Sequence, residues 1–81
     1  MGKLRVLSGN DLLRIFALFG FNPVARRGSH VKLRRTLLNG IRQTLTIALH
    51  DEIAKGTLRA IYSQALRYIP ETDLRRHFHA D

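Results

Sequence analysis

The chain has 81 residues, of which 14 are Lys or Arg and six are Asp or Glu, so its formal net charge is +8. This length has room for one small domain, and the absence of cysteine excludes disulfides, thiolate metal sites and a cysteine nucleophile. No apolar run approaches the roughly 20 residues of a membrane-spanning helix. The first residues lack the apolar segment of a signal peptide, so we expect a soluble, cytoplasmic protein without membrane contact.

Residues 9–19 have the pattern of an amphipathic helix. Ser8 and Asp11 have the spacing of a capping box, in which each side chain accepts a hydrogen bond from the backbone N–H of the other. Gly20 is suited to end the helix in the left-handed conformation, after which Phe21 can pack back on the helix. The apolar residues recur at intervals of three and four: Leu12, Ile15, Phe16 and Phe19.

Two strands, Asn22–Arg27 and His30–Thr36, are predicted on either side of Gly28-Ser29. Gly at the first central position of a two-residue turn is a hairpin signal, because it tolerates a positive φ. Alternation places His30, Lys32 and Arg34 on one face of the hairpin, opposite the apolar face. The turn predicts three cross-strand pairs: Arg27 with His30, Ala25 with Lys32, and Val24 with Leu33.

A third strand is predicted from about Ile41 to Ala48, after a three-residue loop in which Gly40 is left-handed. We favour this loop because a two-residue turn would mix apolar and polar faces. The chosen register opposes Leu33 to Leu45 and Val31 to Ile47, with Ile41 on the same apolar face. It also puts Thr44, Thr46 and Ala48 beside Arg34, Lys32 and His30.

A second helix begins near residues 55–57, and Pro70 either stops it or opens a short third helix over 71–78. Its predicted buried stripe is Leu58, Ile61, Tyr62 and Ala65, while Arg59, Gln64 and Arg67 face outward. The fold class is therefore α+β, in the order α-β-β-β-α. A three-stranded antiparallel sheet has two helices on one face and basic side chains on the other.

The charge is distributed unevenly, since no acidic residue lies between Asp11 and Asp51. A field of one sign attracts polyanions and accelerates their encounter with the protein. Nucleic acid, or an acidic protein that mimics it, is the expected partner; the alternative is a cationic surface that serves only solubility. The basic residues of this window are Arg14, Arg26, Arg27, Lys32, Arg34, Arg35 and Arg42.

His30 is the strongest candidate for chemistry, because it opens a strand on the basic face. An imidazole with a pKa near 6.5 suits proton transfer at neutral pH; the alternative is a surface histidine in a basic hairpin. His50 precedes the second helix, where it either orients a substrate or caps that helix. His77 and His79 have no third ligand in view, so we expect no metal site. Ser29 lacks the partners of a serine hydrolase.

Several blocks of the sequence together resemble the HicA-type (YcfA-like) toxin family of bacterial toxin–antitoxin systems. The resemblance is strongest over 3–65, within a single domain of residues 1–81 whose segment 66–81 is a tail or short helix. It rests on Lys3–Gly9, Gly20-Phe21, Arg27–His30, His50–Leu58, Ile61 and Gln64-Ala65. It implies a fold like the double-stranded RNA-binding domain and a ribosome-independent mRNA interferase, in which the histidine of Gly-Ser-His, here His30, is catalytic. It also implies a HicB-type antitoxin that covers the site.

Two positions depart from the family pattern: Ala48 stands where the family often has proline, and Leu66 where it has glycine. The first concerns the loop that carries His50, and the second the C-terminal helix. Neither touches His30, so an active enzyme is expected.

We therefore expect a toxic endoribonuclease that cleaves single-stranded mRNA without a metal or other cofactor. His30 would be the general acid or base, and His50 a secondary candidate. The residues expected to bind RNA are Arg27, Gly28, Ser29, Lys32 and Arg34, with Lys3 and Arg5 extending the track. Leu37 and Leu38 are the expected apolar anchors for the antitoxin. The alternatives are an RNA-binding module of the same fold without catalysis and a basic subunit that binds only an acidic protein.

Overall fold

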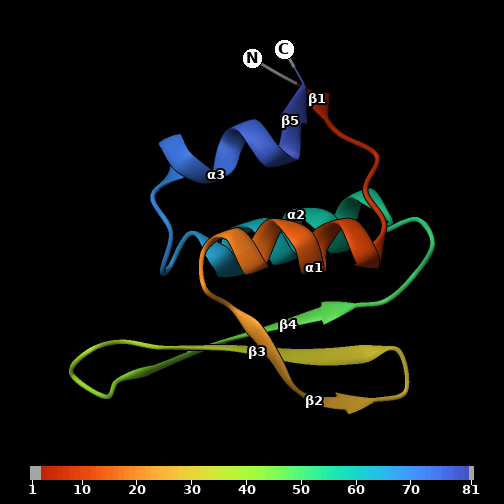
Figure 1. The fold of residues 1–81 in the computed structure, drawn as a ribbon. Coiled ribbons are helices and arrows are strands. Elements are labelled where there is room, and N and C mark those ends of the chain that lie inside the picture. The colour runs from red at the N-terminus through yellow and green to blue at the C-terminus, as the bar shows by residue number, and fades with distance from the viewer. Residues whose placement is uncertain (1–2, 81) are drawn as a thin grey trace.

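A computed structural model describes residues 3–80 and confirms the α+β fold in three layers (Figure 1). A three-stranded antiparallel sheet forms one outer layer, α1 and α2 form the middle layer, and α3 with a two-stranded sheet forms the third. No helix in the described part of the chain is long and apolar enough to cross a membrane. The elements are β1 (Lys3–Leu4), α1 (Gly9–Leu18), β2 (Asn22–Arg27), β3 (His30–Thr36), β4 (Arg42–Ala48), α2 (Lys55–Ala65), α3 (Glu71–Phe78) and β5 (His79–Ala80).

Both ends of α1 have the predicted caps. Ser8 Oγ accepts a hydrogen bond from the Asp11 N–H at 3.0 Å, and the Asp11 carboxylate accepts one from the Ser8 N–H at 2.9 Å. At the other end Gly20 has a φ of +86°, and the Phe21 N–H donates to the Phe16 carbonyl at 3.0 Å. The two phenylalanine rings lie edge to face, with centroids 6.4 Å apart.

The register of the hairpin between β2 and β3 is confirmed near the turn and wrong further along. Arg27 pairs with His30 and Ala25 with Lys32, but Pro23 rather than Val24 pairs with Leu33. Val24 is the extra residue of a β-bulge, and its side chain is 48% exposed. Proline lacks the N–H of a regular ladder and occurs at edge strands and bulges, which is where this one lies.

The register between β3 and β4 is confirmed throughout. Leu33 pairs with Leu45 and Val31 with Ile47, and Gly40 has the expected left-handed φ of +85°. The prediction that Ile41 joins the apolar face is wrong. Ile41 precedes β4, its carbonyl accepts from the Leu37 N–H at 2.8 Å to close the loop, and its side chain is 55% exposed.

The core lies on both sides of the helical layer. Leu33 and Leu45 of the sheet are fully buried, as are Phe16 of α1 and Phe78 of α3. The Phe78 ring lies 5.9 Å from Phe16 and 5.1 Å from Tyr62 of α2. Two helices therefore cover one sheet face, as predicted, and α3 covers them in turn.

Gln64 does not face outward, contrary to the sequence prediction. Its Oε1 accepts a hydrogen bond from the Thr46 N–H at 2.9 Å, and its Nε2 donates to the Thr46 carbonyl at 3.2 Å. The side-chain amide of α2 thus occupies the outer edge of β4. These two hydrogen bonds hold α2 directly beside β4. They depend on how the helix packs on the sheet, so the spacing of apolar residues in the sequence did not indicate them.

Candidate functional site

The turn between β2 and β3 holds His30 in a fixed position. Gly28 has a φ of +60°, and a Cβ added there would contact nothing, so backbone conformation is the reason for glycine. Arg26 Nε donates to the Gly28 carbonyl at 2.9 Å and closes the turn from the side. His30 consequently begins β3 directly opposite Arg27.

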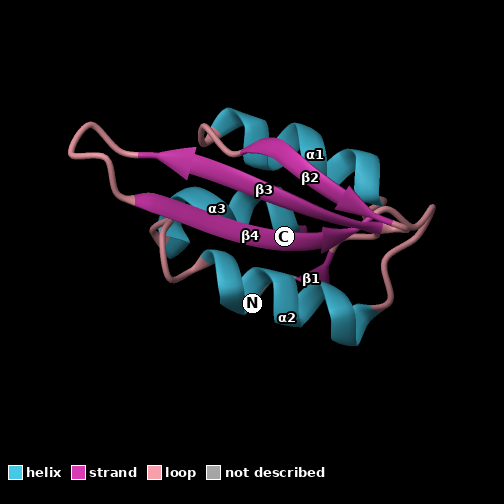
Figure 2. Cartoon of the chain, turned by 90° about the horizontal axis from the view of Figure 1, so that it is seen from below, coloured by secondary structure: helices cyan, strands magenta, loops and turns pink. Residues whose placement is uncertain are grey.

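A shallow cavity of about 290 Å³ lies at this end of the sheet. His30 and Lys32 are exposed in it, and none of the described residues that line it is acidic. Figure 2 shows that no helix covers this face of the sheet, since α1 and α2 both lie behind it. The residues that line the cavity are Ala25, Arg26, Arg27, His30, Val31, Lys32 and Thr46. The structure therefore brings one imidazole together with three cations on an accessible surface.

Two further predicted residues, Arg34 and Ser29, do not line the cavity but lie close in sequence to residues that do. Arg34 follows Lys32 on the same face of β3 and is half-buried; its Nε is buried and has no hydrogen-bond partner among the described residues. The Ser29 carbonyl accepts from the Leu49 N–H at 2.7 Å, so the backbone of Ser29 ties the turn to the end of β4. Arg26 and Thr46 are polar lining residues that were not among the predicted RNA-binding residues, although the predicted pairing with Lys32 placed Thr46 there.

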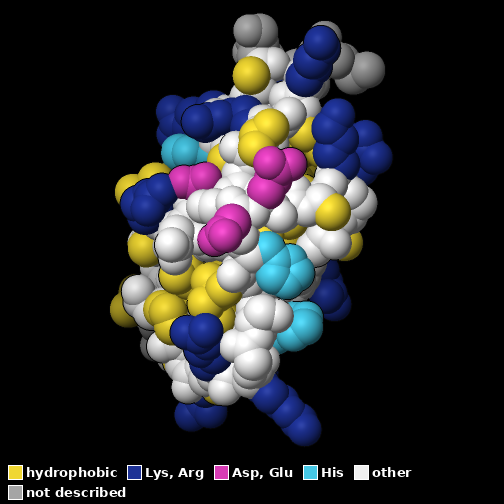
Figure 3. Space-filling model, turned by 90° about the vertical axis from the view of Figure 1, so that its right-hand side faces the viewer, with side chains coloured by type: hydrophobic (Ala, Val, Ile, Leu, Met, Phe, Trp, Pro, Cys, Tyr) yellow, Lys and Arg dark blue, Asp and Glu magenta, His cyan; other side chains and the backbone are white. Residues whose placement is uncertain are grey.

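His50 lies at the same end of the sheet as His30. His30 pairs with Ala48, and the bond between Ser29 and Leu49 continues that ladder by one step, which puts His50 across from the turn. The Gly9 N–H at the start of α1 donates to the His50 carbonyl at 2.8 Å, and the imidazole is exposed. Figure 3 looks at this end and shows histidine side chains next to one another, bordered by acidic side chains.

The alternative role of His50 as a helix cap is wrong. The N-cap of α2 is Ala54, which makes no side-chain capping bond, and the first helical hydrogen bond runs from the Leu58 N–H to the Ala54 carbonyl at 2.8 Å. His50 lies four residues before this cap, because the segment between them is used to cross from the sheet to the helical layer (Figure 1). Its side chain is therefore free for another role.

Lys3 and Arg5 are not brought together with the hairpin. Lys3 pairs with Ala80 in the two-stranded sheet, and the Arg5 N–H donates to the Phe78 carbonyl at 2.7 Å. Both residues belong to the third layer, and α1 and α2 separate that layer from the large sheet (Figure 1). Lys3 and Arg5 therefore do not extend the row of cations on the sheet face that carries His30.

Arg35 has a structural role that the sequence analysis missed. Its guanidinium donates to the carbonyls of Phe19 and Tyr68, both at 3.0 Å, and to Gln43 Oε1 at 2.9 and 2.6 Å. It also lies 4.6 Å from the centre of the Phe21 ring, a cation–π distance. Strand alternation puts Arg35 on the helix-covered face, and this parity was the signal available in the sequence. Not every cation of the acid-free window therefore serves a ligand.

Two titratable groups outside the cavity, His77 and Tyr62, have pKa values shifted by their surroundings. Burial, followed by the nearby Arg76 and Arg5, lowers the pKa of His77 from its ordinary value. Burial and the hydrogen bond to Glu71 raise the pKa of the Tyr62 phenol. Within residues 3–80, no three His, Asp or Glu side chains are close enough together to hold a metal ion.

The fold and the site define a class: a small α+β protein that displays a histidine among cations on the open face of an antiparallel sheet. The model of the family described as the HicA toxin of bacterial toxin–antitoxin systems matches residues 9–66. This match spans more than half of the chain, and the protein belongs to the HicA toxin family. Neither the curated proteins nor the solved structures contain a match to this chain.

Proposed function

We propose that this toxin is a metal-independent endoribonuclease that cleaves mRNA in the cytoplasm and that His30 is its catalytic residue. The observation that supports this most directly is the cavity in which His30 lies beside Arg27 and Lys32. An imidazole transfers protons near neutral pH, and the two cations suit a phosphate whose negative charge grows during the reaction. Membership of the HicA toxin family supports RNA as the substrate that we propose for this arrangement.

In the proposed reaction the 2′-hydroxyl of one nucleotide attacks the neighbouring phosphorus. The 2′-oxygen loses its proton as the new P–O bond forms, and the 5′-oxygen takes up a proton as its bond to phosphorus breaks. The products are a 2′,3′-cyclic phosphate and a 5′-hydroxyl. His30 carries out one of these proton transfers, and Arg27 and Lys32 hold the non-bridging oxygens. His50 is the candidate for the other transfer, because its exposed imidazole lies at the same end of the sheet.

We also propose that a HicB-type antitoxin silences the enzyme by covering His30. The apolar anchors proposed from the sequence need revision: Leu37 is half-buried, whereas Leu38 is fully exposed and Ile41 is 55% exposed. Leu38 and Ile41 lie at the loop after β3, about 25 Å along the strand direction from His30 at 3.3 Å per residue. An antitoxin that uses both the apolar loop and the basic cavity would span the whole face of the sheet.

The test is cleavage of a single-stranded RNA by the purified protein. We expect cleavage to persist in EDTA and to be abolished by His30→Ala, while Thr36→Ala, at the far end of the same strand, remains active. Binding of the His30→Ala variant to RNA should be retained. If the wild-type protein binds RNA but never cleaves it, the non-catalytic RNA-binding module is the correct function. Cleavage by a folded His30→Ala variant would overturn the catalytic assignment.

A further inference from the structure

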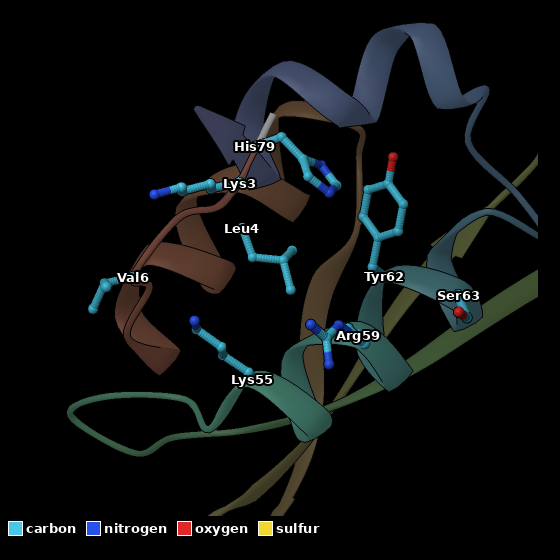
Figure 4. Close-up of a pocket in the computed structure, with 8 residues that line it drawn as sticks. All are labelled: Lys3, Leu4, Val6, Lys55, Arg59, Tyr62, Ser63 and His79. Atoms are coloured by element: carbon cyan, nitrogen blue, oxygen red, sulfur yellow. The ribbon is translucent and has the colours of Figure 1, made fainter. Parts of the chain in front are cut away.

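A second and larger cavity, of about 680 Å³, lies between the two-stranded sheet and α2 (Figure 4), and it shares no described lining residue with the cavity that holds His30. The short strands β1 and β5 form one wall, and the exposed face of α2 forms the other. Figure 4 shows Lys55 and Arg59 extending from α2 toward β1, with Leu4 between the two walls. The lining residues are Lys3, Leu4, Val6, Lys55, Arg59, Tyr62, Ser63 and His79.

The charged side chains among the described lining residues are all basic. Lys55 and Arg59 are four residues apart, so they lie on the same face of α2, and Lys3 lies across the cavity on β1. Among residues 3–80, no carboxylate lines the cavity. In the part of the chain that the structure describes, the one ion pair joins Arg14 to Asp11, so none of these three cations forms an ion pair with a described carboxylate. Like charges held close together repel one another, and an anion between them would relieve that repulsion.

His79 supplies an observation of a different kind. Its Nδ1 is buried and has no hydrogen-bond partner among the described residues. The imidazole is held edge-on against the Tyr62 ring, with centroids 5.1 Å apart. A buried polar nitrogen without a partner costs free energy, and in the tautomer that carries the proton on Nδ1 a bound acceptor would satisfy it. The first turn of α2 also begins at this cavity without a side-chain cap, so its free N–H groups add positive potential.

We propose that this cavity binds a phosphate group of the RNA strand, at a second anion site separated from His30 by the helical layer. Lys3, Lys55 and Arg59 provide the charge, and His79 provides a hydrogen-bonding nitrogen. The Tyr62 phenol donates to Glu71 Oε2 at 3.0 Å, so the polar end of that ring is already satisfied. The inference rests on the proposed function in one respect, namely that RNA is the ligand. Holding one strand at two places raises its effective concentration at the catalytic cavity.

The site can be tested by NMR titration of the isotopically labelled wild-type protein with a short 2′-O-methyl oligonucleotide. This probe has no free 2′-hydroxyl, so binding is measured separately from cleavage and does not depend on the role of His30. We expect shifts at the amides of residues 55–57 and at the His79 imidazole. Strands with and without a 5′-phosphate distinguish the source of the ligand: equal shifts indicate internal phosphodiesters, and shifts with the 5′-phosphate alone indicate a terminal phosphate. Either result supports the site.

A matched pair of variants supplies the second measurement. Arg59→Gln removes a charge from the cavity, and Arg67→Gln removes the same charge from an exposed position just beyond the end of α2. The slope of log K against log salt for the oligonucleotide should become shallower by about 0.7 in Arg59→Gln alone. Equal effects of the two substitutions, or no shifts around the cavity, would overturn the proposal. Shifts produced by poly-glutamate but not by the oligonucleotide would also overturn it and assign the cavity to an acidic protein.

Discussion

Replacing Gly9 with alanine has two opposite effects on stability: a gain in helix propensity and a steric clash with β4. Gly9 is the first residue of α1 and is buried. Alanine is favoured over glycine in helices by about 1 kcal/mol, so propensity alone predicts stabilisation. A Cβ at this position, however, would lie 2.6 Å from the Ala48 carbonyl oxygen and closer still to the Leu49 Cα. Both are backbone atoms, which cannot swing aside as a flexible side chain does.

The clash should win. Overpacking against a tightly packed neighbour costs about 1–3 kcal/mol, and here the end of β4 must move away from α1 to relieve it. The movement also strains the 2.8 Å hydrogen bond from the Gly9 N–H to the His50 carbonyl. We expect Gly9→Ala to lower the free energy of unfolding by about 2 kcal/mol. For a domain of this size that corresponds to a fall in Tm of about 8–16 °C.

Gly56 is the matched control, because it lies in the first turn of α2 and a Cβ there would have nothing within 4 Å. Gly56→Ala should be neutral or stabilise the protein by up to about 1 kcal/mol. Both variants can be compared by urea unfolding followed by circular dichroism. If Gly9→Ala is as stable as Gly56→Ala, the close approach of α1 to β4 does not limit this position. A loss of RNA cleavage in Gly9→Ala beyond its loss of folded protein would further indicate that this contact positions His50.

Three further predictions concern stability. Arg35→Met should lower the free energy of unfolding by about 2–3 kcal/mol, because it removes charged hydrogen bonds to Gln43 and to two backbone carbonyls; a urea titration that shows no loss would contradict this role. The backbone and side-chain hydrogen bonds with Ser8 lower the pKa of Asp11 below 3.8. The ionised carboxylate therefore stabilises the folded protein above that pH, and this stabilisation is lost as the pH falls through the depressed pKa. Asp11→Asn should therefore flatten the acid limb of stability against pH, and an unchanged limb would refute the capping role. Burial lowers the pKa of His77 below 6.5, so folded protein should lose stability as the pH falls below 6.5, and His77→Phe should remove that dependence in thermal unfolding.

Local features of the fold were predictable from the sequence because neighbouring residues determine them. The capping box of Ser8 and Asp11 requires only residues three apart, and the turn at Gly28 requires only a residue that tolerates positive φ. The register of β3 on β4 followed from alternation, since one slip would expose Leu33. His30 was placed opposite Arg27 by the same local reasoning, and its catalytic role remains a prediction.

The features that the sequence did not predict depend on contacts between distant segments. The bulge at Val24 lies where the edge strand β2, which contains Pro23, pairs with β3. The pattern of apolar residues along the chain did not indicate this bulge. Arg35 reaches carbonyls 16 and 33 residues away, so no local motif marks it. Lys3 could be assigned to an RNA track only by its charge, whereas the pairing of β1 with β5 places it in another layer.

The amide of Gln64 also bears on how copies of this protein behave at high concentration. An exposed edge of a sheet is a template on which another chain can add a strand, which leads to polymerisation and amyloid. At Thr46 both backbone groups of the β4 edge are already occupied by a side chain that imitates a peptide group. The opposite edge, β2, is interrupted by Pro23 and the bulge beside it. Open-ended growth by edge pairing is therefore obstructed on both sides, and a basic sheet face can stay open to ligands without making the molecule prone to form fibrils.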